Sequence, residues 1–209
     1  MIKSIQLFAV VLLLLAAGAT SGGHHHGCPD VPSMTAKKAC STVCGTRHTH
    51  QLCLRTLLPR RSRHAASPVT HYAAVAARSA LDAYDATEAA ARQATLYVRG
   101  PAALPRDERV AYAGCLAGYK TARQSMSRLA GDLARMASSS SCHGAANLRR
   151  DYKGGLRGMD ACRRSLFGYG YTASPLSGRN LADRNATFLA ALLCSLVPTP
   201  PEKRRGVEV

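Results

Sequence analysis

The sequence predicts an all-α protein, in which a short helical hairpin precedes an up-and-down four-helix bundle. Apolar residues in four long segments recur at steps of three and four, which is the spacing of one face of an α-helix. No segment shows the alternation of apolar and polar residues between tight turns that is typical of a half-buried strand. Glycine and proline separate the segments, and long helices joined by short loops pack as a bundle.

The two ends of the chain are expected to lie outside this domain. Residues 1–23 are predicted to be a signal peptide, because Lys3 precedes an apolar run of ten residues and small residues follow it. Ten residues are too few to span a bilayer. Residues 24–34, with three consecutive histidines, are expected to form a flexible arm, and residues 198–209 a disordered tail. The helical domain then covers residues 35–197.

Two short helices are expected at the start of the domain. The first is predicted over residues 34–44, and Gly45 with the following His48-Thr49-His50 stretch breaks it. The second is predicted over residues 50–58, with leucines along one side. A proline ends this second helix, and a basic loop follows.

The first two long helices are predicted over residues 68–98 and 105–136. Ser67 supplies an N-cap and Pro68 the first helical position, and the alanine-rich run that follows contains no glycine or proline. The second long helix has the clearest apolar pattern of the chain, with alternating steps of three and four. Its predicted core residues are Tyr112, Cys115, Tyr119, Ala122, Met126, Leu129, Leu133 and Met136.

The last two long helices are predicted over residues 145–166 and 177–197. Gly154, Gly155 and Gly158 each weaken the first of these by roughly 1 kcal/mol relative to alanine. The alternative is that they let another helix approach closely. The predicted apolar face of the last helix comprises Leu181, Phe188, Leu189, Leu192, Leu193 and Leu196.

The eight cysteines allow 105 pairings, so their number alone assigns no disulfide. Cys44 and Cys53 flank the break between the short helices, a spacing suited to stapling a helical hairpin. Cys115 and Cys162 fall on the inward faces of two long helices, where a bridge would lock these helices together. Each such bridge contributes about 2–4 kcal/mol, mainly by restricting the unfolded chain.

The order of these features resembles the plant family of invertase and pectin methylesterase inhibitors. Residues 43–57, VCGTRHTHQLCLRTL, look like the opening motif of the family, C-x-x-T-x5-C-x3-L. Residues 111–119 are similar to its A-x3-C-x3-Y on the second long helix. Three further stretches contribute to the resemblance, which spans nearly the whole predicted domain: residues 80–82, 158–162 and 185–190.

The resemblance implies two disulfides, Cys44–Cys53 and Cys115–Cys162, and therefore a disulfide-stapled hairpin before the four-helix bundle. Cys194 lies where many family members have an unpaired cysteine in the last helix. The family pattern leaves three other cysteines without an assignment: Cys28, Cys40 and Cys142.

Family members inhibit cell-wall carbohydrate enzymes by binding them as proteins, and they have no catalytic group of their own. The resemblance therefore implies no enzymatic activity, no cofactor and no metal. The sequence lacks the G-x-S-x-G, P-loop, dinucleotide and H-E-x-x-H signatures. Together with the signal peptide, the resemblance implies a secreted protein of the apoplast and cell wall, with no membrane contact after cleavage.

Two target enzymes compete as the expected partner, pectin methylesterase and cell-wall or vacuolar invertase. Invertase inhibitors often carry a Pro-Lys-Phe segment after the second long helix, and residues 142–150 contain none, which favours pectin methylesterase. The resemblance implies that the side of the bundle covers the enzyme's cleft. Polar residues on the first two long helices are the candidate contacts, unless they are plain solvated surface: Asp82, Asp85, Glu88 and Gln124.

The basic composition supports an alternative of another class. The chain has 28 Lys and Arg against 12 Asp and Glu, a net charge of +16. Demethylated pectin is a polyanion, and a cationic protein would concentrate on it through a salt-sensitive field. A cationic pectin-binding or defence protein without an enzyme target is therefore the alternative. Nucleic acid is not an expected partner, because the basic residues do not alternate with stacking aromatics.

Two smaller features complete the sequence-based expectations. A zinc site is an alternative that oxidation in the secretory pathway opposes; its ligands would be Cys40, Cys44, His48 and His50. The three histidines of the arm together with Cys28 are a weaker metal candidate. Asn185 opens the only N-x-T/S sequon, inside a predicted helix, so its glycosylation depends on the direction in which Asn185 faces.

Overall fold

The computed structural model describes residues 31–58, 65–96, 104–138, 142 and 144–198. In chain order the elements are β1 (Ser33–Thr35), α2 (Ala36–Val43), α3 (Arg47–Leu57), β2 (Ala66–Pro68), α4 (Val69–Leu96), α5 (Arg106–Ser138), α6 (Ala145–Gly168) and α7 (Pro175–Cys194). The predicted signal peptide and nearly all of the predicted tail lie outside the described residues. The predicted fold class is confirmed: an all-α bundle follows a disulfide-stapled hairpin.

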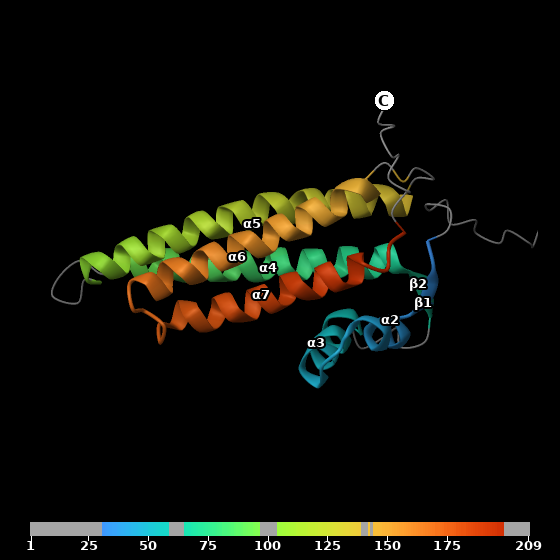
Figure 1. Ribbon diagram of the computed structural model, residues 1–209, viewed down its shortest axis with the longest axis horizontal. Helices are drawn as coiled ribbons and strands as arrows, with labels where there is room; N and C mark the ends of the chain where they lie inside the picture. The colour runs from blue at the N-terminus through green and yellow to red at the C-terminus, as the bar shows by residue number, and fades with distance from the viewer. Residues whose placement is uncertain (1–30, 59–64, 97–103, 139–141, 143, 199–209) are drawn as a thin grey trace, which may run out of the picture.

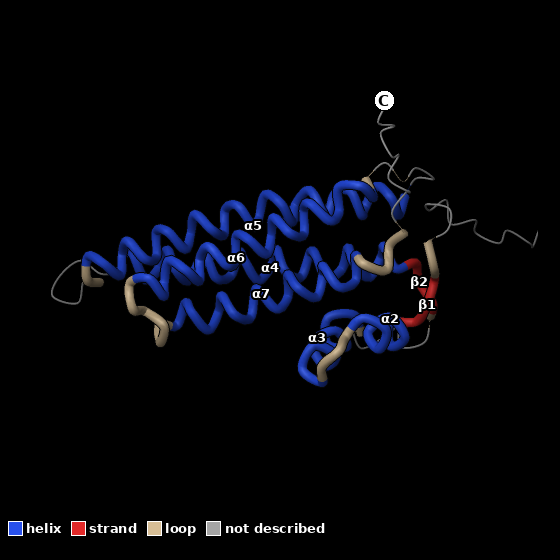
Figure 2. The backbone as a smooth tube through the Cα atoms, in the orientation of Figure 1, coloured by secondary structure: helices blue, strands red, loops and turns tan. Residues whose placement is uncertain are grey.

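The four long helices lie side by side and alternate in direction (Figure 1). Helix α4 packs against α5 and α7, and α6 packs against the same two neighbours, so the four helices enclose one core. The α2–α3 hairpin contacts α4 and α7 at the end of the bundle where α4 begins and α7 ends. Strands β1 and β2 pair antiparallel at the same end (Figure 2).

The predicted core face of α5 is confirmed, because all eight of its residues are buried. Steps of three and four keep successive side chains on one stripe of the helix, and in the bundle this stripe faces the shared core.

The two disulfides between described residues are of the structural type that forms and persists in an oxidising compartment. Within the described residues, none of the helices is long and apolar enough to cross a bilayer.

Helices α5 and α6 approach one another closely through glycine. A Cβ atom on Gly118 would lie 2.5 Å from the carbonyl oxygen of Gly158, and a Cβ on Gly158 would lie 2.6 Å from the backbone nitrogen of Ala122. The predicted bridge Cys115–Cys162 joins the same two helices. Of the two interpretations of the α6 glycines, the structure supports close helix approach.

The predicted bridge Cys44–Cys53 is wrong, since Cys53 pairs with Cys40. Cys40 lies on the buried face of α2, and both Cys40 and Cys53 are fully buried between the two short helices. Cys44 lies at the C-cap of α2, where it is half-buried and carries a free thiol. The sequence also departs from the family motif here, because Thr46 follows Cys44 by two residues and not by three.

The start of the domain also differs from the prediction. The predicted flexible arm ends at residue 34, but Ser33 and Met34 belong to β1, which pairs with Ser67 and Pro68. Pro68 therefore closes a strand instead of opening a helix. Strands of three residues are too short to show an alternating pattern in a sequence. Helix α3 begins before residue 50, because Thr46 and Thr49 form a reciprocal capping box.

Helix α7 places another face inward than the sequence predicts. Leu189 and Leu193 are buried as expected, but Leu181 and Phe188 are exposed. Polar residues of α7 take their place inside the bundle. These buried polar residues are Asn180, Asp183 and Thr187.

The buried polar residues are hydrogen-bonded across three helices. The Asp183 carboxylate accepts from the Thr87 hydroxyl at 2.7 Å and from the Tyr119 hydroxyl at 2.6 Å. The hydroxyls of Tyr84 and Thr187 share a hydrogen bond at 2.5 Å. Satisfying buried polar groups avoids a penalty of about 1–3 kcal/mol each. This network therefore fixes the rotation of α7 relative to α4 and α5.

Burial makes Asp183 a source of pH dependence. Desolvation is the main cause that raises the pKa of its carboxyl, and the hydrogen bonds from Tyr119 and Thr87 partly oppose it. A folded-state pKa above the unfolded value means that ionisation lowers stability. The penalty is absent well below the unfolded pKa of about 3.9 and complete above the folded-state pKa.

Asp183→Asn removes this titration. The stability advantage of the wild type over the variant is therefore expected to shrink as the pH rises from about 3.5 to about 7. Urea unfolding followed by circular dichroism at several pH values measures it. An advantage that stays constant or grows with pH would contradict the assignment. Tyr119→Phe removes a donor that lowers the pKa of Asp183, so it should make the total loss of stability with rising pH larger.

Candidate functional site

The four predicted contact residues lie on two adjacent helices. Asp82, Asp85 and Glu88 follow one another on α4 at steps of three, and Gln124 lies on α5. Asp82, Asp85 and Gln124 are exposed, whereas Glu88 is only 8 % exposed. The structure thus places all four on the packed pair α4–α5, but it gives Glu88 a position inside the helix contact.

Arg123 of α5 holds the acidic residues of α4. Its Nη2 atom donates to Glu88 Oε1 at 3.0 Å and its Nε atom to the same oxygen at 3.1 Å. Arg123 also forms an ion pair with Asp85, and this contact is the largest cause that raises the pKa of the guanidinium. Arg92 donates to the other Glu88 oxygen, Oε2, at 2.9 Å. Asp85 and Glu88 therefore serve the α4–α5 contact, which the sequence did not predict.

A shallow groove runs beside this cluster. It has a volume of about 420 Å³, and Glu88, Leu116, Lys120 and Arg123 are among the residues that line it. Its walls combine a cationic rim with an apolar patch, and the described lining contains no hydroxyl, thiol or imidazole group. Such a surface has the chemistry to contact a protein or a polyanion.

Among the described residues, the cysteines form two disulfides, Cys40–Cys53 and Cys115–Cys162, and two have free thiols, Cys44 and Cys194. Cys142 is also disulfide-bonded. Burial raises the pKa of the Cys194 thiol to about 12, so it is inert at physiological pH. Desolvation also raises the pKa of Cys44, and a hydrogen bond with Thr49 partly opposes it.

The zinc alternative is wrong for the residues that the structure describes. Cys40 is oxidised in a disulfide, so it is not available as a thiolate ligand. In the described part of the chain, no three His, Cys, Asp or Glu side chains lie close enough together to hold a metal ion. The histidines of the predicted arm and Cys28 lie outside the described residues.

The sequon lies within α7. Asn185 is half-buried, and Thr187 is fully buried, where it donates to the backbone oxygen of Asp183 at 2.8 Å. In the folded protein the sequon threonine thus belongs to the buried polar network. A glycan on Asn185 would have to be added before this network forms.

A second hollow lies between α6 and α7, and the sequence analysis did not identify it. Phe167 and Leu181 are exposed beside it, together with arginines from both helices. The sequence held only one sign of this hollow, the apolar residue Leu181, which the sequence analysis assigned to the core face of the last helix.

The fold and surface define a class: a disulfide-stapled helical bundle with a charged face along α4 and α5. A comparison of the chain with known protein families, with curated proteins and with solved structures finds no match. The resemblance to the inhibitor family therefore remains an interpretation of the sequence and of this architecture.

Proposed function

We propose that the protein is a secreted inhibitor that binds a cell-wall carbohydrate enzyme, pectin methylesterase, and covers its substrate cleft. The observation that carries the proposal is the architecture: a stapled helical hairpin precedes four long helices, and Cys115–Cys162 joins the second long helix to the third. This is the arrangement that the family resemblance implies. The hairpin bridge differs from the family expectation in using Cys40.

Secretion to the apoplast is part of the proposal. Two disulfides between described residues require an oxidising environment, which agrees with the predicted signal peptide. The inhibitor has no catalytic role, so it acts only by occupying space and by forming contacts at the enzyme surface.

The α4–α5 face is the proposed contact surface. The buried polar network joins α4 and α5 through Asp183 of α7, and the disulfide and the glycine packing join α5 to α6. These contacts hold the two helices of the face in place, and rigid surfaces lose little entropy on binding. Asp82 and Gln124 are exposed and available to a partner. Asp85 and Glu88 act indirectly, because Arg123 holds both.

Two alternatives remain proposals of their own. The first is an invertase as the target, acting through the same face. The second is a cationic protein that binds pectin, for which the net charge of +16 is the supporting observation.

The function is tested by titrating the protein against pectin methylesterase and invertase at wall-like pH and moderate salt. We expect stoichiometric inhibition of the methylesterase. The double variant Asp82→Asn and Gln124→Ala should inhibit about tenfold more weakly, a loss of about 1.4 kcal/mol, with an unchanged melting temperature. The matched control is Asp107→Asn with Gln51→Ala, which changes the same residue types elsewhere on the exposed surface.

The outcomes separate the alternatives. Inhibition of invertase alone would make invertase the target. No inhibition of either enzyme, with salt-sensitive binding to polygalacturonate, would support the pectin-binding alternative. Full inhibition by the double variant would remove the α4–α5 face from the proposal while leaving the inhibitor function in place.

A further inference from the structure

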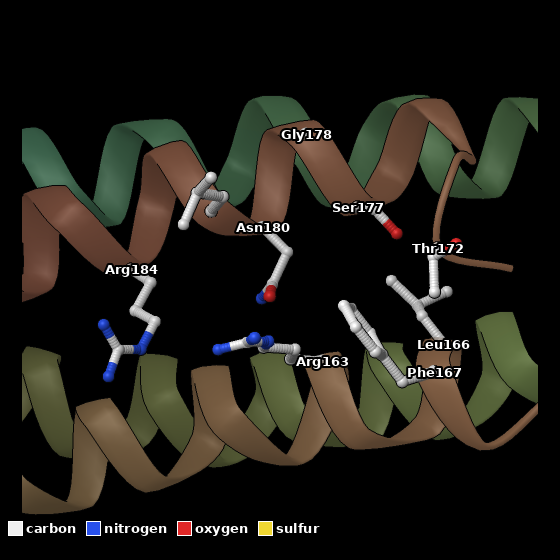
Figure 3. Close-up of a pocket in the computed structure, with 9 residues that line it drawn as sticks. Arg163, Leu166, Phe167, Thr172, Ser177, Gly178, Asn180 and Arg184 are labelled. Atoms are coloured by element: carbon white, nitrogen blue, oxygen red, sulfur yellow. The ribbon is translucent and has the colours of Figure 1, made fainter. Parts of the chain in front are cut away.

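The hollow between α6 and α7 has the features of a ligand site that is separate from the proposed contact face. It has a volume of about 280 Å³. Arg163 and Phe167 reach into it from α6, and Asn180 and Arg184 reach into it from α7 (Figure 3). Asn180 is buried and donates to the backbone oxygen of Met159, so the floor of the hollow is held by a contact between the two helices.

The walls of this hollow are apolar and open. Phe167 is 49 % exposed and Leu181 is 55 % exposed. Of the five large apolar residues that are exposed in the described chain, two line this hollow, Phe167 and Leu181. Tyr169 after α6 and Phe188 on α7 are also exposed but do not line it. Exposed apolar side chains that gather around a hollow mark an interaction site more often than isolated ones do.

A glycine leaves the room that the hollow needs. A Cβ atom on Gly178 would meet no atom within 4 Å, so α7 presents bare backbone at this point. Gly178 lines the hollow one turn before Leu181. A larger residue at this position would fill the space and would not disturb the packing of the bundle.

The rim of the hollow is cationic. The Arg163 guanidinium lies 5.0 Å from the centre of the Phe167 ring. Arg184 donates from Nε to Asp160 Oδ1 at 2.8 Å, and a guanidinium has further N–H donors beyond this one. Arg164 lies beside Arg163 in the adjoining surface. Arg163 and Arg184 line the hollow, Arg164 lies on the adjoining surface, and of these three only Arg184 is paired with the Asp160 carboxylate. The excess of positive charge at this end of the hollow attracts an anion.

We propose that this hollow binds a small carboxylate that carries a flat apolar ring. The ring packs between Phe167 and Leu181, and the carboxylate lies at Arg163 and Arg184. Arg–carboxylate contacts are planar and directional, so the two ends of the ligand are distinguished. The hollow has room for a single ring with a short side chain. Its volume of about 280 Å³ lies below the range of roughly 300–1,000 Å³ that is usual for pockets that hold drug-sized ligands.

Binding is tested on the whole protein by isothermal titration calorimetry with cinnamate as the probe. Cinnamyl alcohol has the same ring without the charge, and galacturonate has the charge without an apolar ring. We expect cinnamate to bind at least tenfold more tightly than either comparator, and its affinity to fall as salt is added. Equal binding of cinnamyl alcohol would overturn the role of the arginines. Equal binding of galacturonate would overturn the apolar part and indicate a sugar-acid site.

Two variants locate the site. Gly178→Leu fills the hollow and improves helix propensity, so it should abolish cinnamate binding without lowering the melting temperature. Phe167→Ala should weaken binding about tenfold. Phe188→Ala is the control, because this residue is exposed on α7 but does not line the hollow. Undiminished binding in Gly178→Leu, or equal weakening by Phe188→Ala, would overturn the proposal.

Discussion

Replacing Cys115 and Cys162 together with alanine is expected to lower the free energy of unfolding by about 4 kcal/mol. The bridge closes a loop with a sequence separation of 47, and the entropy of the unfolded chain rises with the length of the loop that is released. For a domain of this size the melting temperature should fall by roughly 10 °C. Chemical and thermal unfolding of the variant under oxidising conditions measure both quantities.

The second bridge provides the matched comparison. Cys40–Cys53 has a sequence separation of only 13, so Cys40→Ala with Cys53→Ala should lose about 3 kcal/mol. Cys44→Ser should leave stability nearly unchanged, because Cys44 is a half-buried free thiol. A large loss in Cys44→Ser, or a peptide map that links Cys44 to Cys53, would show that the hairpin uses the other pairing.

Gly158→Val is expected to lower the free energy of unfolding by about 3 kcal/mol. A Cβ atom at this position would lie 2.6 Å from the carbonyl oxygen of Gly118 and from the backbone nitrogen of Ala122. Backbone atoms do not rotate away as side chains do, so α5 and α6 must move apart. Urea unfolding measures the loss, and separation of the helices should also weaken the α5 contacts that hold Asp183.

A half-buried glycine of α5 that lies outside the close helix contact separates packing from helix propensity. A Cβ atom on Gly131 would meet only the end of the Arg135 side chain, at 3.7 Å. Gly131→Ala should therefore stabilise the protein by up to about 1 kcal/mol. If Gly158→Val were as stable as Gly131→Ala, the close approach of α5 and α6 would not be a packing constraint.

These substitutions also bear on function, because α5 belongs to the proposed contact face and α6 belongs to the hollow. Helix α5 carries Arg123 and Gln124 of the α4–α5 face, and α6 carries Arg163 and Phe167 of the hollow. Loss of the bridge between these helices should therefore weaken enzyme inhibition and cinnamate binding together. The local variants Gln124→Ala and Gly178→Leu should each affect only one of the two.

The buried residues could be predicted most accurately from the sequence where the spacing of apolar residues alone determines which face of a helix is buried. The α5 pattern names eight core residues correctly, because steps of three and four leave one choice of face. Helix α7 shows the limit of this argument. The apolar residues of α7 lie on more than one side of the helix, so their spacing does not select one buried face. Its buried polar residues would be assigned to the surface from the sequence alone.

The hairpin disulfide shows a second limit. Cys40 and Cys44 are four residues apart, and both are near enough in sequence to pair with Cys53. Which of them faces α3 depends on where α2 ends and which side of it packs. Helix α2 ends at Val43, so Cys44 falls outside the buried face of the hairpin.

By itself, the sequence determined the helical class, the approximate extent of the four long helices and the core face of α5. Local spacing, caps and breaks act within a few residues, so they can be read along the chain. Only the tertiary structure decided which side of α7 is buried, that Cys40 is the partner of Cys53, and that Arg123 holds Asp85 and Glu88. The physical reason is that the interhelical contacts of the Asp183 network and of Arg123 join residues 35 to 103 positions apart, and their energies exist only after the helices have packed.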